Sequence, residues 1–154
     1  SRMVKMNSER EGDEAVVEEQ HTEFEVYEEI EKAFGMNVVG LEYLPEGVTF
    51  LDYELDSTLK RAYLFYQCQN SILEYRISFS PTEQAIGYQV EDQLLNEQIL
   101  NVNGTPITLK SYETSGSSEI LHVANFEYQS IYYTITGNLS DAEMKEIIKN
   151  LYFL

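Results

Sequence analysis

The pattern of apolar and polar positions is clearest near the C-terminus, where it changes from a strand period to a helix period. Residues 132–136 are aromatic or β-branched, which is typical of a strand, and a glycine and an asparagine end that run. Ser140 then precedes Glu143 by three residues, the spacing of a capping box at a helix N-terminus. The positions behind it are apolar at i, i+3, i+4 and i+7: Met144, Ile147, Ile148 and Leu151. We therefore predict a strand followed by a helix whose apolar stripe packs on a sheet.

A second helix is predicted near the N-terminal end. Thr22 and Glu25 form another capping box, and Gly35 stands where a helix C-terminus favours glycine. One face of the stretch between them is apolar: Val26, Tyr27, Ile30, Ala33 and Phe34. This pattern predicts an amphipathic helix over residues 22–35.

Three strands are predicted at 48–55, 59–68 and 71–80, and the short loops between them favour an antiparallel meander. The register that these loops imply sets Glu54 opposite Arg61 and Tyr63 opposite Arg76. One face then collects the apolar side chains: Leu51, Tyr53, Leu55, Ala62, Leu64, Tyr66, Leu73, Tyr75, Ile77 and Phe79. The other collects mainly charged ones: Asp52, Glu54, Arg61, Tyr63, Glu74 and Arg76. This separation is what a sheet with one buried face requires.

Further turn signals divide the remaining chain. Asn103-Gly104 favours a type I′ hairpin, which pairs Leu100 with Ile107 and Glu97 with Lys110. Residues 80–83 form a capping box that predicts a short helical turn, 88–96 are predicted as a loop, and 119–128 as a strand whose buried face the pattern leaves open. Residues 1–20 are polar and acidic, and we predict that they form a disordered tether. The whole pattern predicts one α+β domain over 21–154, a twisted antiparallel sheet of six or seven strands with an N-terminal and a C-terminal helix packed on it.

Charge and composition exclude some classes of partner. The 154-residue chain has a formal net charge of −17, which repels the phosphates of nucleic acids and of anionic lipid head groups. No run of about 18 apolar residues occurs, so any attachment to a membrane needs an anchor that is absent from this chain. Cys68 is the single cysteine and cannot form an intrachain disulfide.

Few residues carry candidate chemistry, and the sequence indicates no catalytic residue, no cofactor and no metal centre. His122 shares an apolar face with its neighbours, which favours a hydrogen-bonded structural role, and Cys68 lacks an evident base. Asp52, Glu54 and Asp56 alternate like half of a calcium loop, but the positions that need Gly and Glu hold other residues. We expect a solvated, ion-paired face there, and a cation site stays as the alternative.

The order of these motifs resembles a known family. It is similar to the domain of unknown function at the extracytoplasmic C-terminus of anti-sigma-factor-like and lipoprotein-like membrane proteins of Gram-positive bacteria. The matching stretches are 30–35, the Leu-Pro-Glu-Gly turn at 44–47, the hairpin at 102–104 and residues 133–143. Family members often carry a tryptophan near the position of Val123, and this chain has none. The resemblance implies an extracytoplasmic location, an N-terminal anchor and a sensing or binding role without catalysis.

These observations lead to one main hypothesis and two alternatives. The main hypothesis is a non-catalytic extracytoplasmic domain that binds a protein, a peptide or an envelope ligand. The alternatives are a small carboxylate- or cation-dependent hydrolase and a cytosolic structural or assembly domain, and the oligomeric state stays open. The candidate partner-binding face is the sheet face away from the helices, since aromatic side chains there offer contact area at low entropic cost. Its residues are Phe50, Arg61, Tyr63, Phe65, Ile72 and Arg76.

Overall fold

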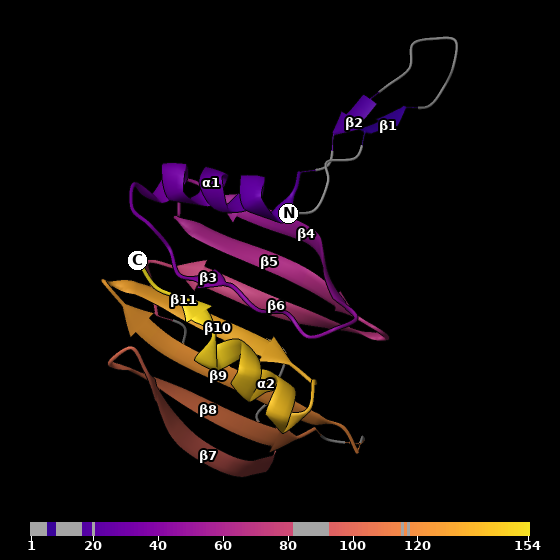
Figure 1. Ribbon diagram of the computed structural model, residues 1–154, viewed down its shortest axis with the longest axis vertical. Coiled ribbons are helices and arrows are strands. Elements are labelled where there is room, and N and C mark those ends of the chain that lie inside the picture. Colours follow the sequence, from indigo (N-terminus) through magenta and orange to yellow (C-terminus); the bar gives the residue numbers. More distant parts are fainter. Residues whose placement is uncertain (1–5, 9–16, 20, 82–92, 115, 117) are drawn as a thin grey trace.

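In the part of the chain that the structure describes, the fold is α+β, with seven antiparallel strands in one sheet and two helices on one of its faces (Figure 1). The computed structural model describes residues 6–8, 17–19, 21–81, 93–114, 116 and 118–154. In spatial order the strands are β4 (Val48–Asp56), β5 (Arg61–Cys68), β6 (Ser71–Ser78), β10 (Ile131–Gly137), β9 (Ile120–Tyr128), β8 (Thr105–Glu113) and β7 (Gln93–Val102). This architecture confirms the predicted fold class.

Both helices begin at the capping boxes that the sequence predicts. Helix α1 (Glu23–Phe34) is capped by Thr22 and ends at Gly35, whose φ of 75° is left-handed. Helix α2 (Asp141–Lys149) is capped by Ser140. Figure 1 shows α1 over β4 and β5, and α2 over β9 and β10. The apolar stripes of both helices are buried against the same sheet face, but Leu151, predicted as the last stripe residue of the second helix, lies beyond the end of α2.

A short two-stranded sheet lies between the helices on that face (Figure 1). It pairs β3 (Gly40–Leu41) with β11 (Leu151–Tyr152), residues more than a hundred positions apart. No alternation pattern predicts such short strands. This pair, which we call the β3–β11 ribbon, completes the layer that covers the core.

The N-terminal segment contains structure that the sequence does not predict. Strands β1 (Met6–Ser8) and β2 (Val17–Glu19) pair antiparallel within the segment that we expected to be disordered. The remaining residues of that segment lie outside the described part. Its role as a tether stays a prediction.

The meander is confirmed except along β4. The pair Tyr63 and Arg76 forms as predicted, but Glu54 lies opposite Tyr63, and Arg61 lies opposite Asp56. The reason is the length of the loop, because β5 begins at Arg61, so that residues 57–60 separate the two strands where the prediction allowed only 57–58. Separately, a β-bulge at Leu51 inserts one unpaired residue between Phe50 and Asp52. Leu51 is therefore 53% exposed, and its prediction as a core residue is wrong.

The second half of the sheet confirms the hairpin and corrects a loop. Asn103 and Gly104 have φ values of 52° and 78°, and Leu100 faces Ile107 while Glu97 faces Lys110. Residues 93–96, predicted as loop, are the start of β7. Residues 82–83 of the predicted capping box and residues 88–92 of the predicted loop lie outside the described residues. In β9 the even positions 122, 124 and 126 face the helices, and Val123 on the opposite face is buried as well.

Candidate functional site

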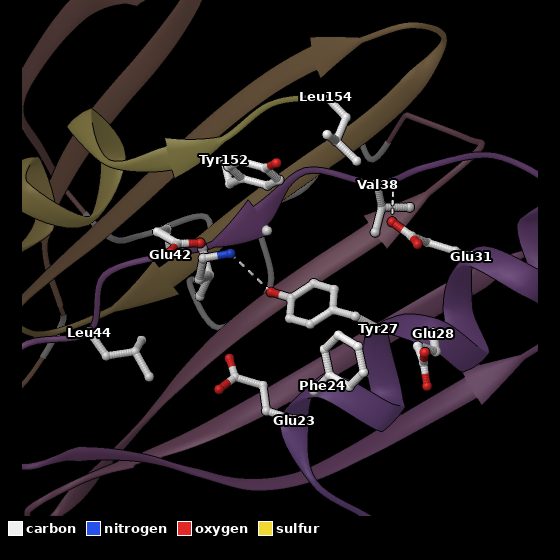
Figure 2. Close-up of a pocket in the computed structure, with 12 residues that line it drawn as sticks. Glu23, Phe24, Tyr27, Glu28, Glu31, Val38, Glu42, Leu44, Tyr152 and Leu154 are labelled. Carbon is white, nitrogen blue, oxygen red and sulfur yellow. Dashed lines mark hydrogen bonds between the residues drawn. The ribbon is translucent and has the colours of Figure 1, made fainter. Parts of the chain in front are cut away.

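An open groove lies between α1 and the β3–β11 ribbon (Figure 2). Its volume is about 650 Å³, within the range of small-ligand sites. Its lining residues are Glu23, Phe24, Tyr27, Glu28, Glu31, Val38, Gly40, Leu41, Glu42, Leu44, Tyr152 and Leu154. The groove therefore combines a helix, a strand segment and the last residues of the chain.

Helix α1 forms one wall through residues spaced three and four apart. Glu23, Tyr27 and Glu31 repeat at i, i+4 and i+8, and Phe24 and Glu28 lie beside them on the same side. Phe24 is 60% exposed because it lies next to the apolar stripe of α1 and not within it. Figure 2 shows Phe24 beside the ring of Tyr27 at the groove.

Two tyrosines connect the base of the groove to the core. The hydroxyl of Tyr27 accepts a hydrogen bond from the Leu41 amide at 3.0 Å, and the hydroxyl of Tyr66 donates to Glu23 at 2.6 Å. Burial is the main cause that raises the pKa of both tyrosines, and the Glu23 charge adds to it. Both hydroxyls stay protonated at neutral pH, so they act as fixed hydrogen-bonding groups.

The opposite wall is the segment 38–41, whose amides bond to side chains from other elements. The Val38 amide donates to Glu31 at 3.0 Å, and the Val39 amide donates to the Tyr133 hydroxyl at 3.1 Å. The Tyr75 hydroxyl donates to the Val39 carbonyl at 2.6 Å. These bonds hold the segment in place, so the groove is preformed.

The groove is acidic and partly aromatic. Four glutamates line it, and none of its lining residues is basic. Glu28 and Glu42 are exposed, and neither has a hydrogen bond or ion pair with another described residue. Tyr152 and Leu154, across from α1, are 50% and 55% exposed. This arrangement can bind a cationic group beside apolar surface.

The predicted partner-binding face needs two corrections. Phe50 lies on the helix-covered face, opposite Tyr66 and with their ring centroids 5.7 Å apart, because the bulge at Leu51 reverses its side. Arg76 is only 5% exposed and lies on β6, an interior strand of the sheet, so it does not form the edge of the face.

The other members of that face form an aromatic and charged row. Tyr63 and Phe65 stack at 6.2 Å, and the Arg76 guanidinium lies 5.9 Å from the Tyr63 ring centroid. Arg61 is half-buried and Ile72 is 43% exposed. A partner on this face stays a prediction.

The remaining candidates lie outside the groove. His122 is buried, and its Nδ1 lies 2.7 Å from the Ser111 hydroxyl, which confirms the predicted hydrogen-bonded role. Burial lowers the pKa of His122 and raises that of the Cys68 thiol. Glu54 and Asp56 face Tyr63 and Arg61. Within the described residues, no group of three or more His, Cys, Asp or Glu could hold a metal ion.

The sequence analysis did not predict any of the groove residues as part of a binding site. The available signal was Phe24, a large apolar residue beside the stripe of an amphipathic helix and surrounded by glutamates. The partner wall had no signal, because Gly40 and Tyr152 meet only through the two-residue pairing of β3 with β11.

Comparison with known proteins identifies a family and no closer relative. Neither the curated proteins nor the solved structures give a match. None of the helices in the described part of the chain is long and apolar enough to cross a membrane. A family model described as Domain of unknown function (DUF4367) matches residues 38–151, which include the β3 side of the groove and the whole sheet. The chain therefore belongs to the family Domain of unknown function (DUF4367).

Proposed function

We propose that this protein is a non-catalytic binding domain whose ligand occupies the groove between α1 and the β3–β11 ribbon. The observation that carries this proposal is the exposure of Phe24 and Tyr152 on the walls of a preformed cleft of about 650 Å³. Apolar surface left in water costs about 25 cal/mol per Å², and a ligand that covers it recovers that free energy. Exposed apolar residues that gather at a concave surface are typical of binding sites.

The experiment is an NMR titration of the full chain with peptides of three classes: basic, acidic and uncharged. We expect at least one class to shift the amide resonances of α1 and of residues 38–44. The double change Phe24→Ser with Tyr152→Ser should weaken that binding about tenfold or more, since exposed aromatic anchors dominate binding energy. Leu59→Ser with Ile99→Ser is the matched control, because it removes two similarly exposed apolar side chains away from the groove. If no class of peptide shifts these resonances, the proposal is wrong.

The proposal includes an extracytoplasmic location, with attachment through an anchor upstream of residue 1. Its support is the resemblance to domains at the extracytoplasmic C-terminus of membrane proteins, together with a net charge that disfavours direct docking on anionic lipids. Protease added to intact protoplasts should digest this domain, while a cytosolic reporter protein stays intact. Full protection of the domain until the cells are lysed would exclude this location.

A further inference from the structure

The charge distribution of the groove points to the chemistry of its occupant. Four of its twelve lining residues are glutamates, and none is lysine, arginine or histidine. Two of the four carboxylates already accept hydrogen bonds within the protein, since Glu23 accepts one from the Tyr66 hydroxyl and Glu31 accepts one from the Val38 amide. Glu28 and Glu42 remain exposed on opposite walls (Figure 2). A ligand with positive charge would find a carboxylate on each side.

The apolar part of the groove indicates that charge is not the only requirement. Phe24 and Leu154 are more than half exposed, and Tyr152 is half exposed. An aromatic ring attracts a cation over its face and also packs against aliphatic carbon, so both parts of a lysine or arginine side chain suit these walls. Neighbouring apolar side chains of the same ligand would cover Leu44 and Leu154.

The backbone of the β3 wall is not available for strand addition. The amides of Val38, Val39 and Leu41 donate to Glu31, Tyr133 and Tyr27 respectively. A peptide that added a strand to this edge would need those donors. The occupant is therefore held through its side chains.

We propose that the groove binds a peptide segment of a protein partner in which lysine or arginine alternates with apolar side chains. This inference rests on the function proposed above and adds the class of ligand. Electrostatic steering supports it, because a chain with a net charge of −17 attracts a basic partner at low salt.

The test uses the full chain and a blocked hexapeptide with the sequence Lys-Leu-Lys-Phe-Lys-Leu. Two matched peptides replace either the lysines by glutamate or the apolar residues by serine. We expect the first peptide to shift α1 and residues 38–44 and to bind at least about tenfold more tightly than either counterpart. n-Butylammonium, a cation without the apolar neighbours, should also bind at least about tenfold more weakly.

A pair of variants then tests the carboxylates. Glu28→Gln with Glu42→Gln should weaken binding about fivefold at low salt, since each exposed ion pair contributes modestly. Glu46→Gln with Glu127→Gln changes the net charge equally at exposed positions outside the groove and should leave affinity unchanged.

The outcomes separate this inference from the function on which it rests. If acidic or uncharged peptides bind in the groove as tightly, or the Glu28 and Glu42 changes have no more effect than their control, the cationic assignment is wrong. Binding of n-butylammonium as tight as that of the peptide would also overturn it. If no peptide shifts the groove resonances, both proposals fail.

Discussion

Buried tyrosine hydroxyls hold the strand segment that forms one wall of the groove. The chain has twelve tyrosines and no tryptophan. Tyr75 and Tyr133 lie stacked in the core and bond the carbonyl and the amide of Val39, so one residue of the segment is fixed from both sides. A phenylalanine would fill the same space without satisfying these buried backbone groups.

Tyr133→Phe should therefore lower the free energy of unfolding by about 1–2 kcal/mol, because it leaves the buried Val39 amide without an acceptor. Denaturant unfolding measures the loss. Tyr63→Phe is the control, since its ring lies on the opposite face of the sheet and its hydroxyl makes no hydrogen bond to another described residue. Equal stability of Tyr133→Phe and wild type would contradict a role for this bond in holding the wall.

Glu74 should make stability depend on pH. Its Oε2 is buried without a hydrogen-bond partner among the described residues, and burial raises its pKa, opposed by Arg76 and reinforced by Glu54. The folded state therefore holds the proton more tightly than the unfolded state, whose pKa is about 4.3. The contribution of Glu74 to stability is complete below that pH and is lost as the pH rises through the raised value.

The change Glu74→Gln removes this titration. The free energy of unfolding of Glu74→Gln, taken relative to wild type, should increase as the pH rises from about 4 to 7. Urea unfolding at a series of pH values measures it, with Glu46→Gln at an exposed turn as control. A relative stability that stays constant over that range, or falls, would show that Glu74 is not desolvated in this way.

At the scale of elements, the sequence predicted correctly those helices, turns and strands that depend mainly on their own residues. The capping boxes at Thr22 and Ser140, the Asn103-Gly104 hairpin and the alternation along β5 and β6 are all local, and the structure confirms them. The bulge at Leu51 is different, because β4 is an edge strand that can accept an extra residue without disturbing a second neighbour. That single insertion explains why Phe50 was assigned to the wrong face.

The groove could not be predicted because it depends on contacts between distant elements. Its walls meet where β3 pairs with β11 over two residues each, too short a stretch for any periodicity. The match to the family model begins at Val38, after α1, although α1 supplies five of the twelve residues that line the groove. Ligand preference would therefore depend partly on a helix outside the matched family region.

The N-cap of α1 provides a test of that dependence. Thr22 accepts from the Glu25 amide at 3.1 Å, and Ser140 makes the same bond to the Glu143 amide at 3.1 Å. Thr22→Ala and Ser140→Ala should each cost about 1 kcal/mol of stability. Only Thr22→Ala should weaken binding of the basic peptide, because Glu23 and Phe24 stand in the first turn of α1. Equal peptide affinity of the two variants would show that the first turn of α1 does not contribute to ligand binding.

At the scale of the whole molecule, the two faces of the sheet differ in cover. The helices and the β3–β11 ribbon lie on one face of the sheet (Figure 1), and the groove between α1 and the ribbon belongs to that layer. The other face carries Tyr63 and Phe65, which are stacked and half-buried on β5. We propose that this second face docks a protein partner, independently of the groove.

The double change Tyr63→Ser with Phe65→Ser tests whether the second face binds a partner independently of the groove. Both side chains are partly solvent-exposed and lie away from the helix-covered core, so the variant should fold, with a circular dichroism spectrum like that of wild type. It should keep its affinity for the basic peptide and lose proteins that wild type retains in a pull-down from envelope extract. Phe24→Ser with Tyr152→Ser should show the reverse, losing the peptide and keeping those proteins.

Sedimentation distinguishes a second copy of the chain, which a net charge of −17 disfavours at low salt, from a different partner. If the Tyr63 and Phe65 variant retains the same proteins as wild type, the second face is not a docking surface, and if it unfolds, these rings belong to the core.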